Sequence, residues 1–278
     1  RLPALEQTLA QELGENHRDH DVQHDRSKQG IPRHGDRRNA EQERHQRQVA
    51  LQLADRIFAL PLPPAPRILE IGCGTGLLSE ALTARIAGGE WLVSDLSPPM
   101  VRRCRARLGN DPRLRFAVID GERPKGAEGP FDLICSSLAA QWFGDLPGAL
   151  ERLFGLLAPG GHLPVTTLAA GTFAEWRAAH EALGLVAGTP DYPSIKALES
   201  LELGGRIEEY AIEERHADAR SFLTALKAIG AGTPVAGRVP QSAGALRRVM
   251  RRFEAEGAIA RYHVASCIFM RRERASSS

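Results

Sequence analysis

Arg67-Ile68-Leu69-Glu70-Ile71-Gly72-Cys73-Gly74-Thr75-Gly76 is the stretch of this sequence that is most informative about the fold. Its first half is an apolar run of strand length, and its second half carries glycine at every second position. Leu78, Leu82 and Ile86 follow at helical spacing. A buried strand that passes through a glycine turn into a helix indicates a nucleotide-binding α/β unit, because the glycines let a ligand approach the backbone and the helix start offers free N–H groups.

Strands and helices alternate on both sides of this stretch. The apolar spacing of residues 49–60 predicts a helix from Gln48 to about Ala59. Further strands are expected at Glu90–Ser94, Leu114–Val118, Phe131–Ser136 and His162–Leu168, and helices at Pro98–Leu108 and 146–157. This alternation predicts an α/β fold with a doubly wound, mostly parallel sheet. Pro164 lies inside the fifth strand and removes a ladder donor, so we expect a bulge or a shifted strand start there.

The second half of the chain alternates less regularly. We expect helices at Phe173–Leu185, Ser221–Ile229 and Ala245–Glu256, and strands at Arg206–Glu214 and Ala260–Met270. The domain is predicted to span residues 48–273, with a helical insertion around 171–200. Residues 1–47 are an atypical segment, His-rich and poor in apolar side chains, and we expect most of them to be disordered or loosely helical and the tail 274–278 to be disordered. The histidine spacings match no metal-ligand set, so no metal is expected.

Composition limits the cellular setting and the partners. The chain has 278 residues, a net charge of +2 and four cysteines without a CxxC pair. The near-neutral charge calls for neither a nucleic acid nor a membrane partner, and the cysteines are expected to be reduced. No apolar run approaches the roughly 20 residues that span a bilayer, and no signal peptide opens the chain, so we expect a cytoplasmic protein. Locally, residues 244–278 hold eight arginines against three glutamates.

Further positions after the second and third strands fit nucleotide binding. Asp95 ends the second strand, where a carboxylate accepts ribose hydroxyls. Asp120 follows the third strand, beside Gly121, in reach of an adenine amino group, and Leu96 and Met100 supply apolar surface for the adenine face. Both aspartates have another interpretation, as caps of the helices that follow them.

The glycine turn has the spacing GxGxG, with an acidic residue two positions before the first glycine, and this form resembles the first motif of class I S-adenosylmethionine-dependent methyltransferases. The resemblance implies a seven-stranded, Rossmann-like sheet and S-adenosylmethionine as cofactor. A dehydrogenase is disfavoured, because the glycine loop of dinucleotide-binding dehydrogenases has the spacing GxGxxG, whereas this chain has GxGxG. The cofactor-binding residues that we expect are Glu70, Gly72, Cys73, Gly74, Gly76, Asp95, Leu96, Met100, Asp120, Gly121 and Ser137.

Two downstream segments narrow the resemblance. Ser136-Ser137-Leu138-Ala139-Ala140-Gln141-Trp142-Phe143-Gly144-Asp145-Leu146 and Thr166-Thr167-Leu168-Ala169-Ala170-Gly171-Thr172-Phe173-Ala174-Glu175-Trp176 resemble the malonyl-acyl carrier protein O-methyltransferases of biotin biosynthesis. The resemblance implies methyl transfer to the free carboxylate of a malonyl thioester on acyl carrier protein. An ionised carboxylate needs no general base, so no catalytic residue is expected beyond Gln141 and Trp142, which we expect to position the acceptor.

Other interpretations of the same residues stay open. Trp142 also suits core packing beside the cofactor pocket, and Gln141 suits a helix start or a pocket wall. The cluster Arg247, Arg248, Arg251 and Arg252 is either a solvated helix face or a docking patch for the acidic carrier protein. Rival functions are methylation of another small acceptor, such as a quinone precursor or natural product, and a non-catalytic methyltransferase-like protein. A nucleic-acid methyltransferase is disfavoured, because no NPPY-type tetrad follows the fourth strand.

The N-terminal segment departs from the family pattern. Relatives carry a tyrosine shortly before the helix expected at Gln48, whereas this chain has no aromatic residue before Phe58. We interpret residues 1–45 as sequence from a displaced frame or a false start, joined to a sound domain. Such a chain is expected to bind cofactor and to turn over poorly. We further expect a monomer.

Overall fold

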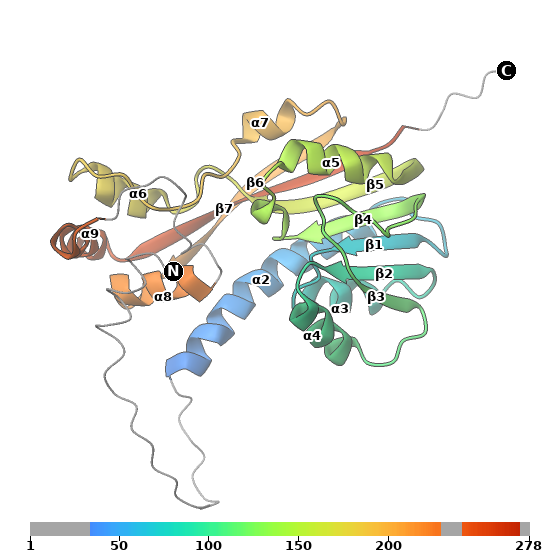
Figure 1. Cartoon of the computed structure of the whole chain (residues 1–278), viewed down its shortest axis with the longest axis horizontal. Helices are drawn as coiled ribbons and strands as arrows, with labels where there is room; N and C mark the ends of the chain where they lie inside the picture. The colour runs from blue at the N-terminus through green and yellow to red at the C-terminus, as the bar shows by residue number, and fades with distance from the viewer. Residues whose placement is uncertain (1–33, 229–240, 273–278) are drawn as a thin grey trace, which may run out of the picture. The chain divides into compact units, whose positions relative to one another are not determined.

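The computed structural model of the chain describes residues 34–228 and 241–272 (Figure 1). The chain divides into two compact units that alternate along the sequence. One unit comprises residues 41–175, 191–215 and 259–278, and the other comprises residues 1–40, 176–190 and 216–258. The predictions of disorder for residues 1–33 and 274–278 fall outside the described residues. In the described ranges, no helix combines the length and the apolar character that crossing a bilayer requires.

The first unit is built on a sheet of seven strands within the described residues, in the order β3-β2-β1-β4-β5-β7-β6. The strands are β1 (Arg67–Ile71), β2 (Glu90–Asp95), β3 (Leu114–Val118), β4 (Phe131–Ser137), β5 (Leu157–Leu168), β6 (Gly205–Arg215) and β7 (Ile259–Met270). The first five strands pair in parallel, and β7 runs antiparallel to both β5 and β6. The predicted α/β class with a mostly parallel sheet is therefore confirmed.

Helices cover both faces of this sheet (Figure 1). They are α2 (His34–Phe58), α3 (Leu77–Thr83) and α4 (Pro98–Leu108) on one side, and the 3-10 helix η1 (Ala140–Trp142), α5 (Leu146–Gly155) and α7 (Ile195–Glu199) on the other. Neighbouring strand residues point to opposite faces, so Ile68 packs in the core under α2 and α3 while Leu69 packs in the core under α5. Both side chains are fully buried, because helices cover β1 from both faces of the sheet.

Several expected element boundaries differ from the structure. The helix expected from Gln48 begins at His34. Pro164 causes no bulge: the β5–β7 register runs through it, and the β4–β5 register resumes beyond it with an unchanged offset. The irregularity lies instead where β5 passes Pro159, between the partners of Phe131 and Leu133. The β4–β5 ladder has no partner pair at Pro164, which is where a missing N–H donor is tolerated.

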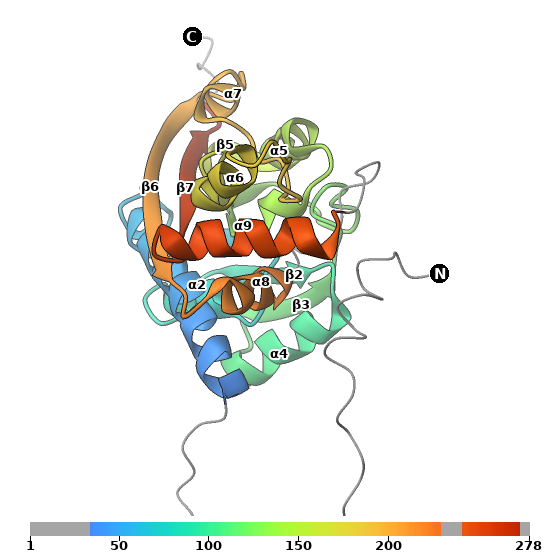
Figure 2. The ribbon, with the colours of Figure 1, turned by 90° about the vertical axis from the view of Figure 1, so that its left-hand side faces the viewer.

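The second unit contains three helices in its described part. They are α8 (Ala219–Ala228), α9 (Ala243–Ala255) and the portion of α6 (Ala174–Glu181) from Trp176 onward. Trp176, Phe222 and Phe253, one from each helix, form an aromatic cluster with ring centroids 5.0 to 5.4 Å apart. Figure 2 shows the three helices side by side. The cluster gives this unit its own apolar core, because aromatic pairs at this spacing add to the stability gained from burial.

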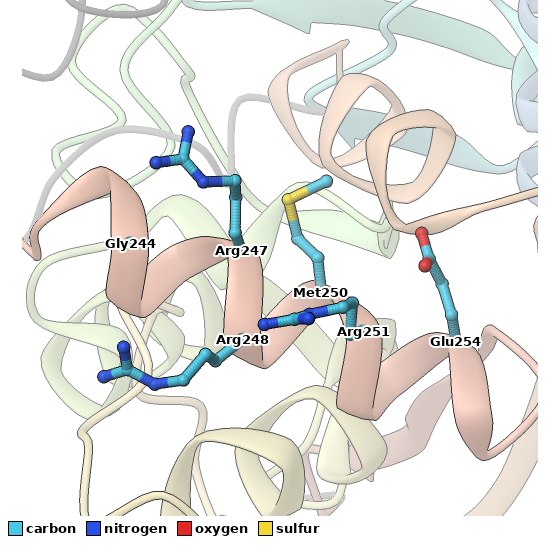
Figure 3. Close-up of a pocket in the computed structure, with 6 residues that line it drawn as sticks. All are labelled: Gly244, Arg247, Arg248, Met250, Arg251 and Glu254. Atoms are coloured by element: carbon cyan, nitrogen blue, oxygen red, sulfur yellow. The ribbon is translucent and has the colours of Figure 1, made fainter.

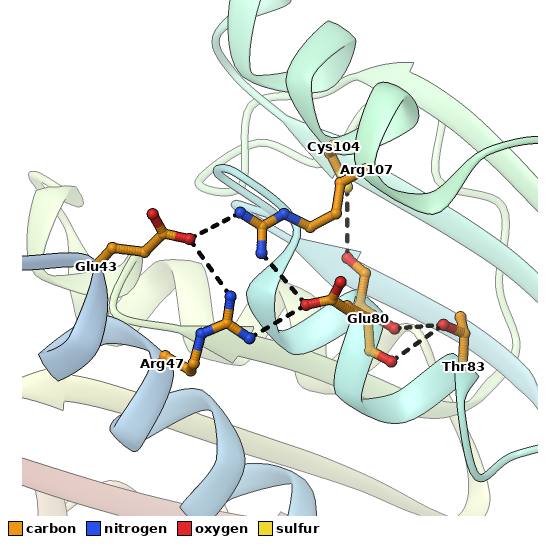
Figure 4. Close-up of polar contacts among 7 residues, drawn as sticks. Glu43, Arg47, Glu80, Thr83, Cys104 and Arg107 are labelled. Carbon is orange, nitrogen blue, oxygen red and sulfur yellow. Dashed lines mark hydrogen bonds and ion pairs between the residues drawn. The ribbon is translucent and has the colours of Figure 1, made fainter. Parts of the chain in front are cut away.

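Ion pairs join α2 to α3 and α4 in the first unit (Figure 4). Arg107 bridges Glu43 at 2.8 Å and Glu80 at 3.3 Å, and Arg47 bridges the same two carboxylates at 3.4 and 3.3 Å. Opposite charges therefore alternate around a four-membered ring of side chains. Glu43 belongs to the segment that composition marked as atypical, yet it takes part in this contact with the domain.

Candidate functional site

The glycine turn after β1 lies where the strand order reverses. β1 is flanked by β2 on one side and by β4 on the other, and the connections from these strands leave in opposite directions. In an open parallel sheet, ligands bind at such a switch point, outside the carboxyl ends of the strands. The residues expected to bind the cofactor follow β1, β2, β3 and β4, so the topology brings these strand ends together at one edge.

Two glycines of the turn have different roles. Gly72 has a φ of +71°, and a Cβ there would collide with the Cβ of Ala139. Gly74 has a φ of +52°, and a Cβ there would meet nothing within 4 Å. Gly72 therefore allows close packing of the segment after β4, whereas Gly74 leaves its backbone open to a ligand.

Asp95 holds this turn from the end of β2. One carboxylate oxygen accepts the Gly74 N–H at 2.9 Å, and the other accepts the Ser97 N–H at 2.8 Å. The Cys73 N–H donates to the Ser94 carbonyl at 2.8 Å, which ties the turn to the same strand. A carboxylate has about four acceptor positions, so Asp95 keeps capacity for two ribose hydroxyls while it fixes the loop.

Glu70 is buried rather than open to solvent. Its side chain is 1% exposed and faces α3, where it accepts a 2.5 Å hydrogen bond from the Ser79 hydroxyl. Burial raises the pKa of Glu70 to about 8, against the opposing effect of the Ser79 hydrogen bond. The carboxyl group is therefore largely protonated at neutral pH. Ser79 was missed in the sequence, because an isolated serine in a helix carries no signal of a partner nine residues away.

The expected adenine-binding residues lie beyond β2 and β3. Leu96 is 67% exposed, which is unusual for a leucine beside a buried strand, and Met100 is partly exposed. Asp120 is exposed and accepts the Glu122 N–H at 3.0 Å. Gly121 is buried against the side chains of Ile71 and Phe143. An exposed apolar surface beside a free carboxylate oxygen suits a flat aromatic base with an amino group.

The segment after β4 completes the edge. Leu138 has a φ of +52°, and its N–H donates to the carbonyl and hydroxyl oxygens of Thr166 at 3.1 and 3.2 Å. The Ser137 hydroxyl lies 3.5 Å from the Thr166 hydroxyl. A positive φ at leucine is strained and clusters at ligand sites. The pairing of Leu138 with Thr166 could not be predicted from the sequence, because only the contact between β4 and β5 joins their two segments.

Gln141 and Trp142 differ in their surroundings. Trp142 is 49% exposed, so it is not packed in a core. Gln141 lines a cavity of about 220 Å³ together with apolar side chains of α5 and α7, among them Leu146 and Leu198. Its Oε1 atom is buried and accepts no hydrogen bond from the described residues. An acceptor without a donor is costly, so a bound group with an N–H or O–H would fit here.

A partly buried polar cluster on α2, β6 and β7 was also missed. The Tyr262 hydroxyl donates to a Glu214 carboxylate oxygen at 2.9 Å, and His45 Nδ1 lies 3.5 Å from the same oxygen. Burial raises the pKa of Tyr262, and the Glu214 charge adds to the effect. These side chains come from three elements far apart in sequence, so no local spacing of residues predicts the cluster. The arginines of the predicted docking patch lie on α9 in the other unit.

The residues present fit the cofactor that the glycine turn implied. Gly74 leaves the loop backbone open, Asp95 keeps free lone pairs, and Leu96 offers an exposed apolar face. Residues 68–161 match the model of the methyltransferase domain family. The Bacillus subtilis protein YcgJ has the same fold, with a TM-score of 0.56 at 14% identity, covering 83% of this chain and 100% of that one. Fold, site and domain match together define a class I methyltransferase with S-adenosylmethionine as its cofactor.

Relatives narrow the class to a family. The chain is 49% identical over 220 residues to the biotin biosynthesis bifunctional protein BioCD of Bordetella avium, covering 79% of this chain and 47% of that protein. It is 44% identical over 225 residues to the malonyl-[acyl-carrier protein] O-methyltransferase of Magnetococcus marinus, covering 79% of this chain and 83% of that protein. The chain thus spans about half the length of the bifunctional protein and most of the single-function one. It belongs to the malonyl-[acyl-carrier protein] O-methyltransferase family.

Proposed function

We propose that this chain transfers a methyl group from S-adenosylmethionine to the free carboxylate of malonyl-acyl carrier protein, giving a methyl ester for biotin biosynthesis. The observation that carries the proposal is the 44% identity over 83% of the length of a relative with that name. The geometry supports the cofactor half of the reaction, because the glycine turn follows β1 at the switch point of the sheet, where ligands bind in open parallel sheets.

Binding and orientation are the tasks of the site residues. Asp95 and the turn around Gly74 would hold the ribose and the amino-acid end of the cofactor, and Leu96 and Asp120 would hold its adenine. When bound, the cofactor supplies an electron-poor methyl group on a positively charged sulfur. The malonyl carboxylate is ionised near pH 7, since its unperturbed pKa is near 4, so the chain has no proton to remove.

Positioning is then the main source of rate acceleration. The acceptor oxygen must approach the methyl carbon in line with the carbon–sulfur bond; the new oxygen–carbon bond forms as that bond breaks, and the electron pair stays on sulfur. Holding two reactants in this geometry is worth about 7–11 kcal/mol of barrier. We assign to Gln141 a hydrogen bond from an N–H or O–H of the bound substrate and not from its carboxylate, because an ionised carboxylate has no donor for the buried Oε1, to which no described residue donates beside an apolar cavity.

The test is transfer of label from methyl-labelled S-adenosylmethionine to malonyl-acyl carrier protein by the full chain. Base-labile label on the malonyl group is the expected result, because an ester is hydrolysed by base. Label on a different small acceptor alone would replace the proposed substrate. Cofactor binding without label on either would leave a non-catalytic methyltransferase-like protein. A family-like N-terminus grafted before Gln48 then tests whether residues 1–47 limit turnover.

Two further expectations belong to the proposal. We propose that the chain works as a monomer and in the cytoplasm. Light scattering after gel filtration, which measures the molar mass in solution, tests the first against the 30.3 kDa of one chain. Fractionation of cells that express the protein tests the second.

A further inference from the structure

Helix α9 presents a row of arginines on its exposed side. Ala245, Val249 and Phe253 recur every four residues and are buried, so they form the packed face of the helix. Arg247, Arg248, Arg251 and Arg252 are exposed. Figure 3 shows Arg247, Arg248 and Arg251 extending away from the helix, with their guanidinium groups toward its Gly244 end. We call Arg247, Arg248 and Arg251 the arginine surface.

The arginine surface is not neutralised by the unit that carries it. Arg252 pairs with Glu256 at 3.5 Å on the same helix. Among the described residues, no ion pair involves any member of the arginine surface. Three guanidinium groups within five residues of one helix repel one another, because like charges three or four residues apart on a helix are destabilising. A face that keeps this repulsion is suited to a partner that brings negative charge.

Apolar surface accompanies the positive charge. Gly244, Met250 and Glu254 border a hollow of about 590 Å³ together with the arginine surface. Met250 is partly exposed there, and methionine adapts its shape to different apolar partners. Guanidinium groups bind carboxylates through two parallel hydrogen bonds. The combination fits an acidic protein face with apolar side chains between its carboxylates.

A nucleic acid fits the arginine surface less well. Non-specific binding to a phosphate backbone depends on many cations in register, and three arginines on one helix supply few. The net charge of the whole chain is only +2, so no wide positive field supports a long polyanion. Met250 would also find no apolar partner along a phosphate backbone.

We propose that the arginine surface docks the acidic carrier protein that delivers the malonyl thioester. This inference rests on the proposed function, in which the acceptor is tethered to a carrier protein. Complementary charge speeds the encounter of two proteins and selects the partner, more than it adds to the final affinity. The arginine surface therefore acts on recognition of the carrier and not on the transfer step.

Charge reversal separates these two roles. The test variant is Arg247→Glu/Arg248→Glu/Arg251→Glu. The matched control is Arg103→Glu/Arg115→Glu/Lys125→Glu. It changes the net charge by the same amount, at three exposed cationic residues of the other unit. For the test variant we expect KM for malonyl-carrier protein to rise about tenfold or more, as loss of electrostatic steering predicts. The turnover number, the Kd for S-adenosylmethionine and the kinetics with a short malonyl thioester should stay unchanged. The control should resemble the parent chain.

Direct binding keeps this test independent of activity. Binding of malonyl-carrier protein to the parent chain and both variants is measured by biolayer interferometry at low and at high salt. We expect weaker binding and a flatter salt dependence in the test variant alone. An equal loss of carrier binding in both variants would overturn the docking assignment, and so would an equal loss of activity with the short thioester. Loss of duplex DNA binding in the test variant, with unchanged carrier binding, would also overturn it. If the parent chain binds carrier but methylates nothing, the proposed function fails and the docking surface stands.

Discussion

Glu70 illustrates how burial changes a single side chain. It precedes the glycine turn by two positions, and its side chain is 1% exposed. Burial raises its pKa to about 8, although the Ser79 hydroxyl donates a 2.5 Å hydrogen bond to it. Removing a carboxylate from water disfavours the charged form more strongly than one neutral hydrogen bond favours it.

The stability of the chain should therefore fall as Glu70 is forced to ionise. The pKa of Glu70 in the fold, about 8, is above its ordinary value of 4.5. Its contribution to stability is fully present below pH 4.5 and is lost as the pH rises through about 8. Glu70→Gln keeps a neutral group of the same shape, so we expect its melting temperature to match the parent at pH 4 and to exceed it at pH 8.5. Each pKa unit corresponds to about 1.4 kcal/mol.

Circular dichroism melts of the cofactor-free chain at both pH values provide the measurement. Glu90→Gln is the matched control, because the Glu90 side chain is 72% exposed. At pH 8.5 the melting temperature of Glu70→Gln should be clearly higher than that of the parent. The melting temperature of Glu90→Gln should equal that of the parent. Parallel curves for parent and Glu70→Gln would show that the carboxyl group is ionised throughout.

We expect Gln141 to lower the stability of the chain and to support its activity. Its Oε1 is buried without a donor from the described residues, and such an atom costs about 1–3 kcal/mol. We expect Gln141→Leu to leave the free energy of unfolding unchanged or to raise it, and to lower kcat/KM for the carrier-bound substrate. Gln52→Leu is the matched control, because Gln52 Oε1 on α2 is also buried without a donor. Urea unfolding and steady-state kinetics of both variants should show the same stability effect and a rate effect in Gln141→Leu alone.

At the scale of the elements, α2 is positioned by charge as well as by apolar packing. Val49, Leu53 and Ile57 bury one side of the helix. Glu43 and Arg47 extend the contact by one to two turns through the ion pairs with α3 and α4. The pKa of Glu43 is lowered, chiefly because Arg107 donates a hydrogen bond to its carboxylate. The contribution of Glu43 to stability is therefore present at pH values above its ordinary pKa, and it is lost as the pH falls through the lowered pKa.

Arg107→Ala should loosen this contact. It removes two ion pairs, and exposed pairs are worth about 0.2–1 kcal/mol each, so we expect a loss of about 1 kcal/mol in the free energy of unfolding. The loss should shrink in 1 M salt, where charges are screened within about 3 Å. Urea titrations at low and high salt are the measurement. Arg103→Ala, an exposed arginine on the same helix, is expected to change little. A loss that persists at high salt would point to packing of the Arg107 stem instead.

For the whole molecule, cofactor binding should raise thermal stability. A ligand present at 100 times its Kd stabilises the state that binds it by about 2.7 kcal/mol, and each kcal/mol shifts the melting temperature of a chain of this size by roughly 2–4 °C. We expect S-adenosylmethionine to raise the transition of the sheet unit by about 5–10 °C.

Asp95→Asn should lose most of this shift. The amide has one acceptor oxygen in place of two, so its NH2 group would face either the Gly74 N–H or the Ser97 N–H, and the ribose site would be weakened. Differential scanning calorimetry with and without cofactor measures both chains. Asp111→Asn serves as the control, since Asp111 accepts a local backbone N–H from Arg113 away from the glycine turn. A cofactor shift in Asp95→Asn equal to that of the parent would remove Asp95 from the binding site.

Local patterns predicted most of the fold. The helix at Pro98–Leu108 and the strand at Leu114–Val118 agree with the structure residue for residue. The wrong boundaries lie where the local sequence does not determine the start of an element. β5 extends back to Leu157, through a Pro-Gly-Gly sequence that locally indicates a stop, because β4 offers a partner there. The helix start at His34 was missed, because its first turns carry no apolar stripe.

The sequence by itself determined the class of protein: the spacing of the glycine turn and the acidic residues after successive strands are local features, and parallel strands necessarily bring their carboxyl ends to one edge. The tertiary structure decided which side chains meet there. Glu70 bonds to Ser79, Leu138 to Thr166 and Tyr262 to Glu214, and no residue in the described part of the chain donates to Gln141 Oε1. These relations depend on packing between separate elements, and the pKa values and unmet hydrogen bonds that govern chemistry arise only when that packing excludes water.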